Sequence, residues 1–286
     1  MSSSITTSFV EQYKSNVLHL AQQKGSRLRG SVMTETVTGK SHYFERLAAT
    51  SAVEKVSRHA DTPLVSQTHS RRKVSLRDFE WADLIDDMDK IKQIIDVQSS
   101  YTQNASNAMG RKIDDLIIAA ATGTAYSGVS GGTSVSLGSG QKIVHASGGL
   151  TIAKLVSAKK ILDENEVDPS QPRFIAVSAE QIEDLLNNTT VTSADFNTIR
   201  ALVSGTISEF MGFKFLRTER LGTDATPSRQ VFAWAKNAIG LAIGKDVTAS
   251  IDKRADKSMA MQVYFCFSAE ATRIEDEAVV EIACNE

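Results

Sequence analysis

The chain has 286 residues, 41% of them hydrophobic, which is enough for one large domain or two smaller ones and excludes a wholly disordered protein. Its 32 Lys and Arg nearly balance 34 Asp and Glu, which argues against a nucleic-acid binder held by net positive charge. Two cysteines exclude a disulfide framework, and no export signal or membrane-length apolar run is present, so the sequence predicts a soluble protein of a reducing compartment.

The charges are unevenly distributed along the chain. Residues 1–80 contain 12 Lys and Arg against 7 Asp and Glu, whereas residues 81–286 contain 20 against 27. This asymmetry favours association between copies, because the basic part of one copy attracts the acidic part of the next. A chance fluctuation over solvated surfaces is the alternative explanation.

The N-terminal segment is predicted to be a helix, followed by a long extended segment. Ser8 and Glu11 have the spacing of a capping box, and apolar residues then recur at helical intervals until Gly25. Over residues 26–75 this periodicity disappears, and alternating stretches such as 30–37 indicate a long two-stranded excursion. An isolated hairpin is not stable in water, so we expect it to lie on a partner subunit.

Two helices and a loop are predicted next. Residues 83–97 place apolar side chains on one helical face, and their aspartates fit a helix start rather than a metal site, because no calcium-loop pattern accompanies them. A longer helix with a continuous apolar stripe is predicted from about Ser99 to Thr122. The Gly- and Ser-rich stretch 123–141 lacks a phosphate-binding motif and is predicted to be a flexible surface connection.

From Thr151 onward the pattern is that of an α/β domain. Helices are predicted from Ile152, after a capping box formed by Ser178 and Gln181, and around Phe196–Ser204. The stretches with strand-like or continuous apolar patterns are 173–177, 205–221, 230–244, 259–271 and 278–284. A strand near residue 284 is expected to pair back beside the long helix.

The sequence contains no recognisable catalytic arrangement. Its five histidines are isolated from one another, and both Cys266 and Cys284 are expected to be buried small hydrophobic residues. Adjacent carboxylates such as Asp114 and Asp115 do not converge on one substrate when they lie on a helix. No enzyme activity, cofactor or metal is therefore predicted.

Five segments, in this order, carry a resemblance to a known family. They are WADLIDDMDKIK at 81–92, NAMGRKIDDLIIAAATGTA at 107–125, ISEFMGFKFLRTERL at 207–221, AWAKNAIGLAIG at 233–244 and RIEDEAVVEIAC at 273–284. Together they resemble the major capsid proteins of tailed bacteriophages with the Hong Kong 97 (Johnson) fold, and the second is similar to the family's spine helix. The resemblance implies an α+β fold with an N-terminal arm (1–30), an extended β-hairpin loop (31–75), a peripheral domain with the spine helix (76–149), an axial α/β domain (150–262) and terminal strands returning to the peripheral domain (263–286).

The same resemblance implies a function and partners. Such a protein self-assembles in the host bacterial cytoplasm into hexamers and pentamers of an icosahedral head shell, which encloses double-stranded DNA and matures from a procapsid. The implied partners are other copies, portal and scaffolding proteins, a decoration protein, and DNA through weak non-specific contacts, with no membrane. No scaffolding-like domain precedes the arm, which departs from some family members. The candidate inter-subunit contacts are Lys40, Arg46, Lys55, Arg58, Arg71, Arg72 and Lys73.

Two alternatives remain open at this point. An encapsulin-type compartment has the same fold and requires a groove for a cargo peptide. A soluble α/β enzyme with its site in residues 150–262 requires a pocket with convergent polar groups.

Overall fold

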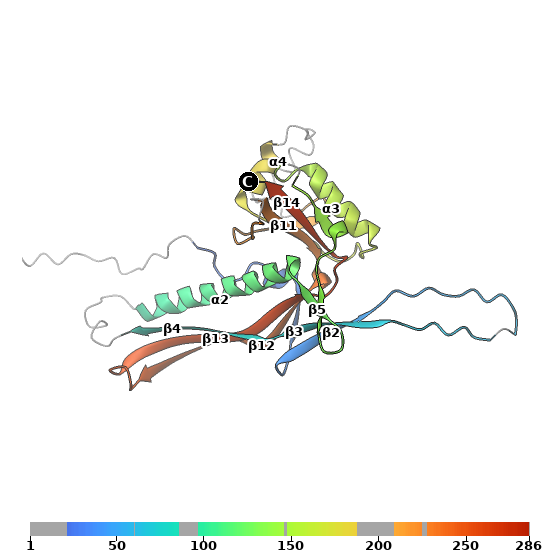
Figure 1. Ribbon diagram of the computed structural model, residues 1–286. Helices are drawn as coiled ribbons and strands as arrows, with labels where there is room; N and C mark the ends of the chain where they lie inside the picture. Colours follow the sequence, from blue (N-terminus) through green and yellow to red (C-terminus); the bar gives the residue numbers. More distant parts are fainter. Residues whose placement is uncertain are drawn as a thin grey trace, which may run out of the picture.

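The computed structural model describes residues 22–59, 61–85, 97–145, 148–187, 209–224 and 228–285 (Figure 1). The helices predicted at the N-terminus and around Phe196–Ser204 lie outside these residues, as does the stretch 86–96.

The long helix α2 and a four-stranded sheet form one unit of the fold. The sheet has the order β1-β12-β13-β4, in which β1 is parallel to β12 and the other neighbours are antiparallel. These elements are β1 (Met33–Thr36), β4 (Arg77–Ile85), β12 (Ile239–Arg254), β13 (Ala260–Arg273) and α2 (Val97–Thr122). α2 lies along one face of the sheet (Figure 1), where the apolar residues of β13 pack against its stripe of Met109, Ile113, Leu116 and Ile117. The long helix predicted from the apolar stripe is confirmed.

A second four-stranded sheet, in the order β2-β3-β5-β6, forms the base of a projecting hairpin. Its strands are β2 (Ser41–Leu47), β3 (His69–Ser75), β5 (Ala125–Ser127) and β6 (Thr133–Val135). The predicted two-stranded excursion is confirmed for residues 41–75 as the β2–β3 hairpin, which extends away from the body (Figure 1). It is wrong for the stretch 30–37, which contains β1, because β1 pairs with β12 in the sheet beneath α2. The Gly- and Ser-rich stretch differs from its prediction, because β5 pairs with β3 and so braces the hairpin.

The third sheet has six strands in the order β7-β14-β11-β8-β10-β9 and carries two helices. The elements are β7 (Lys142–Ile143), α3 (Ile152–Glu164), β8 (Arg173–Val177), α4 (Ala179–Asn187), β9 (Glu209–Phe210), β10 (Phe213–Arg217), β11 (Ser228–Ala235) and β14 (Val279–Asn285). Short 3-10 turns occur at Arg29–Ser31 (η2), Ser139–Gln141 (η3) and Lys236–Ala238 (η4). The predicted α/β pattern is confirmed, and the buried indole of Trp234 packs at its core beside Phe232 and Phe174.

The helix predicted from residue 83 is wrong for Asp83–Ile85, which end strand β4 and pair with β13. Along β4, the partly buried Phe79 and Trp81 alternate with the exposed Asp78 and Glu80. The alternation ends after Trp81, because Ala82, Asp83 and Leu84 are all exposed. Pairing with β13 nevertheless continues to Ile85, and this cross-strand pairing stabilises the strand over the helical pattern that begins at residue 83.

The observed strand pairing also differs from two of the predicted ranges, the axial domain at 150–262 and the terminal strands at 263–286. β12 lies within the range 150–262, yet it belongs to the sheet beneath α2. β14 does not return to that sheet and instead lies between β7 and β11. Its residues Val279, Val280 and Ile282 are buried on both faces, which a central strand provides and an edge strand does not.

Candidate intersubunit contact surface

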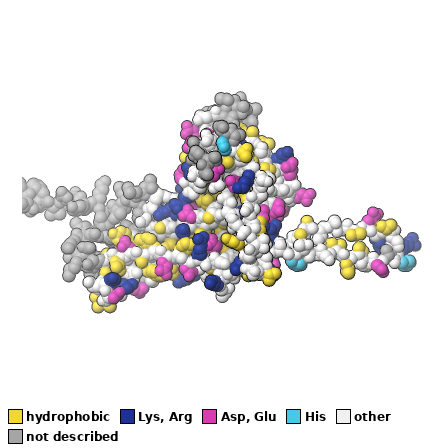
Figure 2. Space-filling view, in the orientation of Figure 1, with side chains coloured by type: hydrophobic (Ala, Val, Ile, Leu, Met, Phe, Trp, Pro, Cys, Tyr) yellow, Lys and Arg dark blue, Asp and Glu magenta, His cyan; other side chains and the backbone are white. Residues whose placement is uncertain are grey.

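The hairpin tip, residues 48–68, projects from the body without sheet partners in the described chain. The strand ladder ends where Ala48 donates a backbone hydrogen bond to Thr68. Beyond that point apolar side chains face solvent, and Val56 and Leu64 are 91% and 96% exposed. Figure 2 shows apolar side chains spread along this projection. Such exposure on a long projecting hairpin is typical of a surface that is covered by another molecule.

The base of the hairpin is seated firmly on the body. Phe44 of β2 and Val74 of β3 form a small buried cluster with Val37 and Ala242. The Phe44 ring lies so close to Gly240 that a Cβ atom there would be 2.6 Å from the ring. The tip is therefore carried on a base whose position is set by packing.

Charged groups connect the hairpin base to the segment between the two large sheets. The Asp276 carboxylate binds the guanidinium groups of both Arg72, on β3, and Arg273, at the end of β13. Arg273 is fully buried and Arg72 nearly so, and burial lowers the pKa of the Arg72 guanidinium. We name these three residues the Asp276 network.

Arg273 also closes the end of α2. Its Nη1 donates to the carbonyl oxygens of Ala121 at 3.1 Å and Gly123 at 2.6 Å, and its Nη2 donates to that of Val135 at 3.1 Å. The last carbonyl groups of a helix have no partners within the helix, so a cation placed there satisfies them. One buried side chain thus joins α2, β6 and the Asp276 network.

The seven predicted contact residues fall into two groups. Lys40, Lys55 and Arg58 are exposed on or near the hairpin, as a contact with another copy requires. The other four are engaged within the chain: Arg46 with Glu277, Arg71 with Glu45, Arg72 with Asp276, and Lys73 with the carbonyl oxygen of Ser130. Part of the charge asymmetry is therefore satisfied within one copy, because ion pairs link basic residues of the first 80 to acids beyond residue 240.

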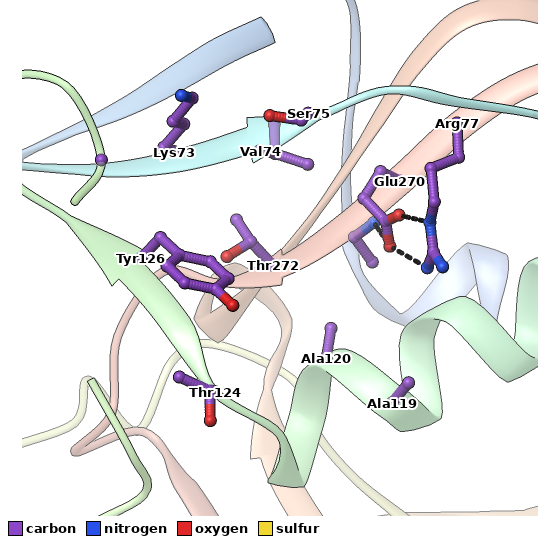
Figure 3. Close-up of a pocket in the computed structure, with 12 residues that line it drawn as sticks. Lys73, Val74, Ser75, Arg77, Ala119, Ala120, Thr124, Tyr126, Glu270 and Thr272 are labelled. Carbon is purple, nitrogen blue, oxygen red and sulfur yellow. Dashed lines mark hydrogen bonds and ion pairs between the residues drawn. The ribbon is translucent and has the colours of Figure 1, made fainter. Parts of the chain in front are cut away.

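An open depression of about 510 Å³ lies between β3, β5, β13 and the end of α2, and Figure 3 shows Arg77 and Glu270 paired beside it while Tyr126 faces its centre. Within the described part of the chain, no group of His, Cys, Asp and Glu is arranged to hold a metal ion. None of the helices described there combines the length and hydropathy needed to cross a bilayer.

The prediction for the two cysteines is half correct. Cys284 is fully buried in β14, but Cys266 on β13 is partly exposed. Hydrogen bonds from Thr248 and Lys245 lower the pKa of the Cys266 thiol.

The fold and the projecting hairpin can be compared with known proteins. The family model described as phage capsid protein matches residues 5–286. The chain belongs to the phage capsid protein family. This capsid protein is therefore a structural subunit of a phage shell, self-associates and resides in the virion. Neither the encapsulin-type compartment nor the soluble enzyme is favoured by these comparisons. No curated protein sequence shows significant similarity to it.

Solved capsid structures have the same fold. The capsid protein is similar to the capsid structure of cyanophage P-SCSP1u, with a TM-score of 0.74 and 18% identity over 99% of this chain and 95% of that chain. It is also similar to the capsid of cyanophage Pam1, with a TM-score of 0.72 and 13% identity over 98% and 97%. For the capsid of Ralstonia phage GP4 the TM-score is 0.71, with 11% identity over 97% and 95%. At these identities the likeness establishes the fold.

Sequence reasoning missed the Asp276 network. The segment RIEDEA, which contains Arg273 and Asp276, contributes to the family resemblance, but that resemblance predicts no buried ion pair. The available signal was an arginine at the end of an alternating apolar strand, followed three residues later by a carboxylate. The second partner of Asp276, Arg72, lies about 200 residues earlier, and no local pattern connects it to this segment.

Proposed function

We propose that the capsid protein builds an icosahedral shell from hexamers and pentamers in which the hairpin tip of each copy lies across its neighbour. The observation that carries this proposal is a long apolar tip exposed to solvent and carried on a packed base. Burying such side chains against another copy removes apolar surface from water, at about 25 cal/mol per Å². Lys40, Lys55 and Arg58 supply polar contacts at the rim of the same interface.

The sheets suggest how the chain is arranged in a capsomer. We assign the axial unit to the six-stranded sheet with α3 and α4, around the centre of each hexamer or pentamer. The peripheral unit then comprises α2 with the sheet of β1, β4, β12 and β13. The arm of residues 1–30 reaches a neighbour with its part before residue 22, because residues 22–30 lie on the body of their own copy. This assignment keeps the proposed roles of the arm and the loop. It revises the ranges 150–262 and 263–286, because β12 belongs to the sheet beneath α2 and β14 belongs to the six-stranded sheet.

Further partners are part of the proposal. Portal and scaffolding proteins, and a decoration protein on the finished shell, would bind the assembled capsid protein, and assembly would take place in the host bacterial cytoplasm. Packaged DNA would be contacted weakly and without sequence preference through scattered Lys and Arg, because the net charge of −2 provides no basic groove.

The test is assembly of the full-length chain, with and without the scaffolding protein, followed by electron microscopy. Closed shells and hexameric capsomers support the proposal, and a monodisperse monomer under all these conditions contradicts it. In a double variant, Val56→Ser with Leu64→Ser, we expect the melting temperature to stay unchanged. The subunit concentration needed for assembly should be about tenfold higher than that of the wild type, or more. The matched control is Val129→Ser, which removes a side chain that is 87% exposed outside the hairpin. Assembly of the double variant at the wild-type concentration would refute the role of the tip.

A further inference from the structure

The first residues that the structure describes form a strap across α2. We name residues 22–31 the N-terminal strap; it ends in η2 and leads into β1. At its far end the indole nitrogen of Trp234 donates to the carbonyl oxygen of Ser31 at 2.9 Å, and Nη1 of Arg27 donates to that of Arg217 at 2.6 Å. The strap therefore contacts the α/β unit as well as the helix.

A single buried carboxylate organises the strap. Asp114 of α2 is fully buried, and its carboxylate accepts hydrogen bonds from the backbone nitrogens of Arg27 at 3.0 Å and Leu28 at 3.1 Å. The side chains of Gln23 and Ser26 also donate to it. Four donors from one short segment satisfy an ionised carboxylate, which carries acceptors only.

Three further residues on the same face of α2 contact the strap. Asn107 accepts a hydrogen bond from the backbone nitrogen of Gly25 at 3.2 Å, and Arg111 donates to Gln22 at 2.7 Å and to the carbonyl oxygen of Gln23 at 3.1 Å. At Gly110 a Cβ atom would overlap the backbone of Gly25. Positions 107, 110, 111 and 114 share one helical face, because they lie three, four and seven residues apart.

The neighbouring carboxylate has a different partner. Asp115 forms a two-pronged ion pair with Arg220, in the segment that follows β10, and both nitrogen–oxygen distances are 2.6 Å. Asp114 and Asp115, on the same turn of α2, therefore bind two different parts of the chain. Asp115 holds the α/β unit, and Asp114 holds the strap.

We propose that Asp114 is a positioning residue for assembly, which fixes the place of the strap and thereby of residue 22, to which the proposed arm is attached. This inference rests on the proposed function, in which that arm reaches a neighbouring copy. The strap itself packs against its own helix, so the contact with Asp114 acts on assembly by holding residue 22, from which the proposed arm extends. Gly110 serves the same contact by its lack of a side chain.

The test compares Asp114→Asn and Gly110→Ala with Asp115→Asn as the matched control, all in the full-length chain. Asn places amide protons among the four donors, and the Ala methyl group displaces Gly25, so both variants should loosen the strap. Hydrogen exchange of the strap amides should become at least about tenfold faster in both variants, with the fold retained. In assembly, we expect each to give open or irregular shells, or closed shells in which Lys14 crosslinks to scattered sites on the neighbour. Asp115→Asn should keep strap protection and the wild-type Lys14 crosslinks.

Closed shells with wild-type Lys14 crosslinks and a loosened strap would overturn the inference while leaving the proposed function intact. Failure of the wild-type chain to assemble would instead refute the proposed function. If Asp114→Asn and Gly110→Ala both fail to fold, their contact serves the fold rather than assembly, which also overturns the positioning role. Ser26→Ala, which removes one donor, gives a milder third point in the same series.

Discussion

Replacing Asp276 by Asn removes the negative charge that two buried guanidinium groups share, while the size of the side chain is kept. In the native chain the side chains of Arg273, Arg72 and Asp276 are 0%, 5% and 19% exposed. Removing one partner of a buried ion pair costs about 3–5 kcal/mol, because the remaining charges stay desolvated. The Asn side chain keeps one acceptor oxygen, so we expect a loss of about 3 kcal/mol.

That loss is large beside a typical domain stability of about 5–15 kcal/mol. For a chain of this size, 1 kcal/mol shifts the melting temperature by about 2–4 °C, so the Asp276→Asn variant should melt about 10 °C below the wild type. Circular dichroism of the unassembled full-length chain measures this. The control is Asp256→Asn, which removes an exposed partner of Arg254 at 2.6 Å and should leave the melting temperature unchanged. Equal melting temperatures for the two variants would refute the importance of the Asp276 network.

Three other predictions follow from single contacts. Four backbone carbonyl oxygens lie within hydrogen-bond distance of Nζ of Lys154, and they share the three protons of its ammonium group. Burial lowers the pKa of Lys154, so unfolding takes up a proton and wild-type stability should rise with pH between the lowered pKa and 10.5. In urea titrations Lys154→Met should lack this rise and lose about 2–3 kcal/mol at pH 7, and a pH profile identical to that of the wild type would contradict this. Gly240→Ala presses against the Phe44 ring and should lower the free energy of unfolding by about 1–3 kcal/mol in the same titration, and wild-type stability would contradict this. Iodoacetamide should alkylate Cys266 with a pH midpoint below that of an ordinary thiol, and Lys245→Met should raise the midpoint; an unchanged midpoint would show that the Lys245 contact has no effect.

The elements that sequence predicted well are those whose signal is local. The apolar stripe of α2 spans many turns, and the Ser178–Gln181 capping box is present, with the Gln181 side chain accepting from the Ser178 nitrogen at 2.9 Å and hydroxyl at 2.6 Å. Pairing between distant segments was not predictable. β1 has only four residues, and nothing in them indicates a parallel partner beginning at Ile239.

The candidate contact surface was predictable in outline only. The loss of helical periodicity over residues 26–75 indicated the hairpin, because a period can be read from neighbours in the chain. Which of its basic residues face another copy could not be read, because the acids that neutralise Arg46 and Arg72 lie about 200 residues away. An ion pair depends on distance in space, and sequence separation carries no such information.

The position of β14 has a consequence for synthesis of the chain. It lies between β7 and β11, yet it is translated after every other strand of its sheet. At about 5–20 residues per second, the ribosome makes the hairpin tip about 10–40 s before β14. During that interval the sheet lacks an inner strand and β11 has an open, apolar edge. Nascent chains on one polysome therefore carry their tips early but complete the body late. We expect this order to make each copy competent for the proposed assembly only after β14 has been synthesised.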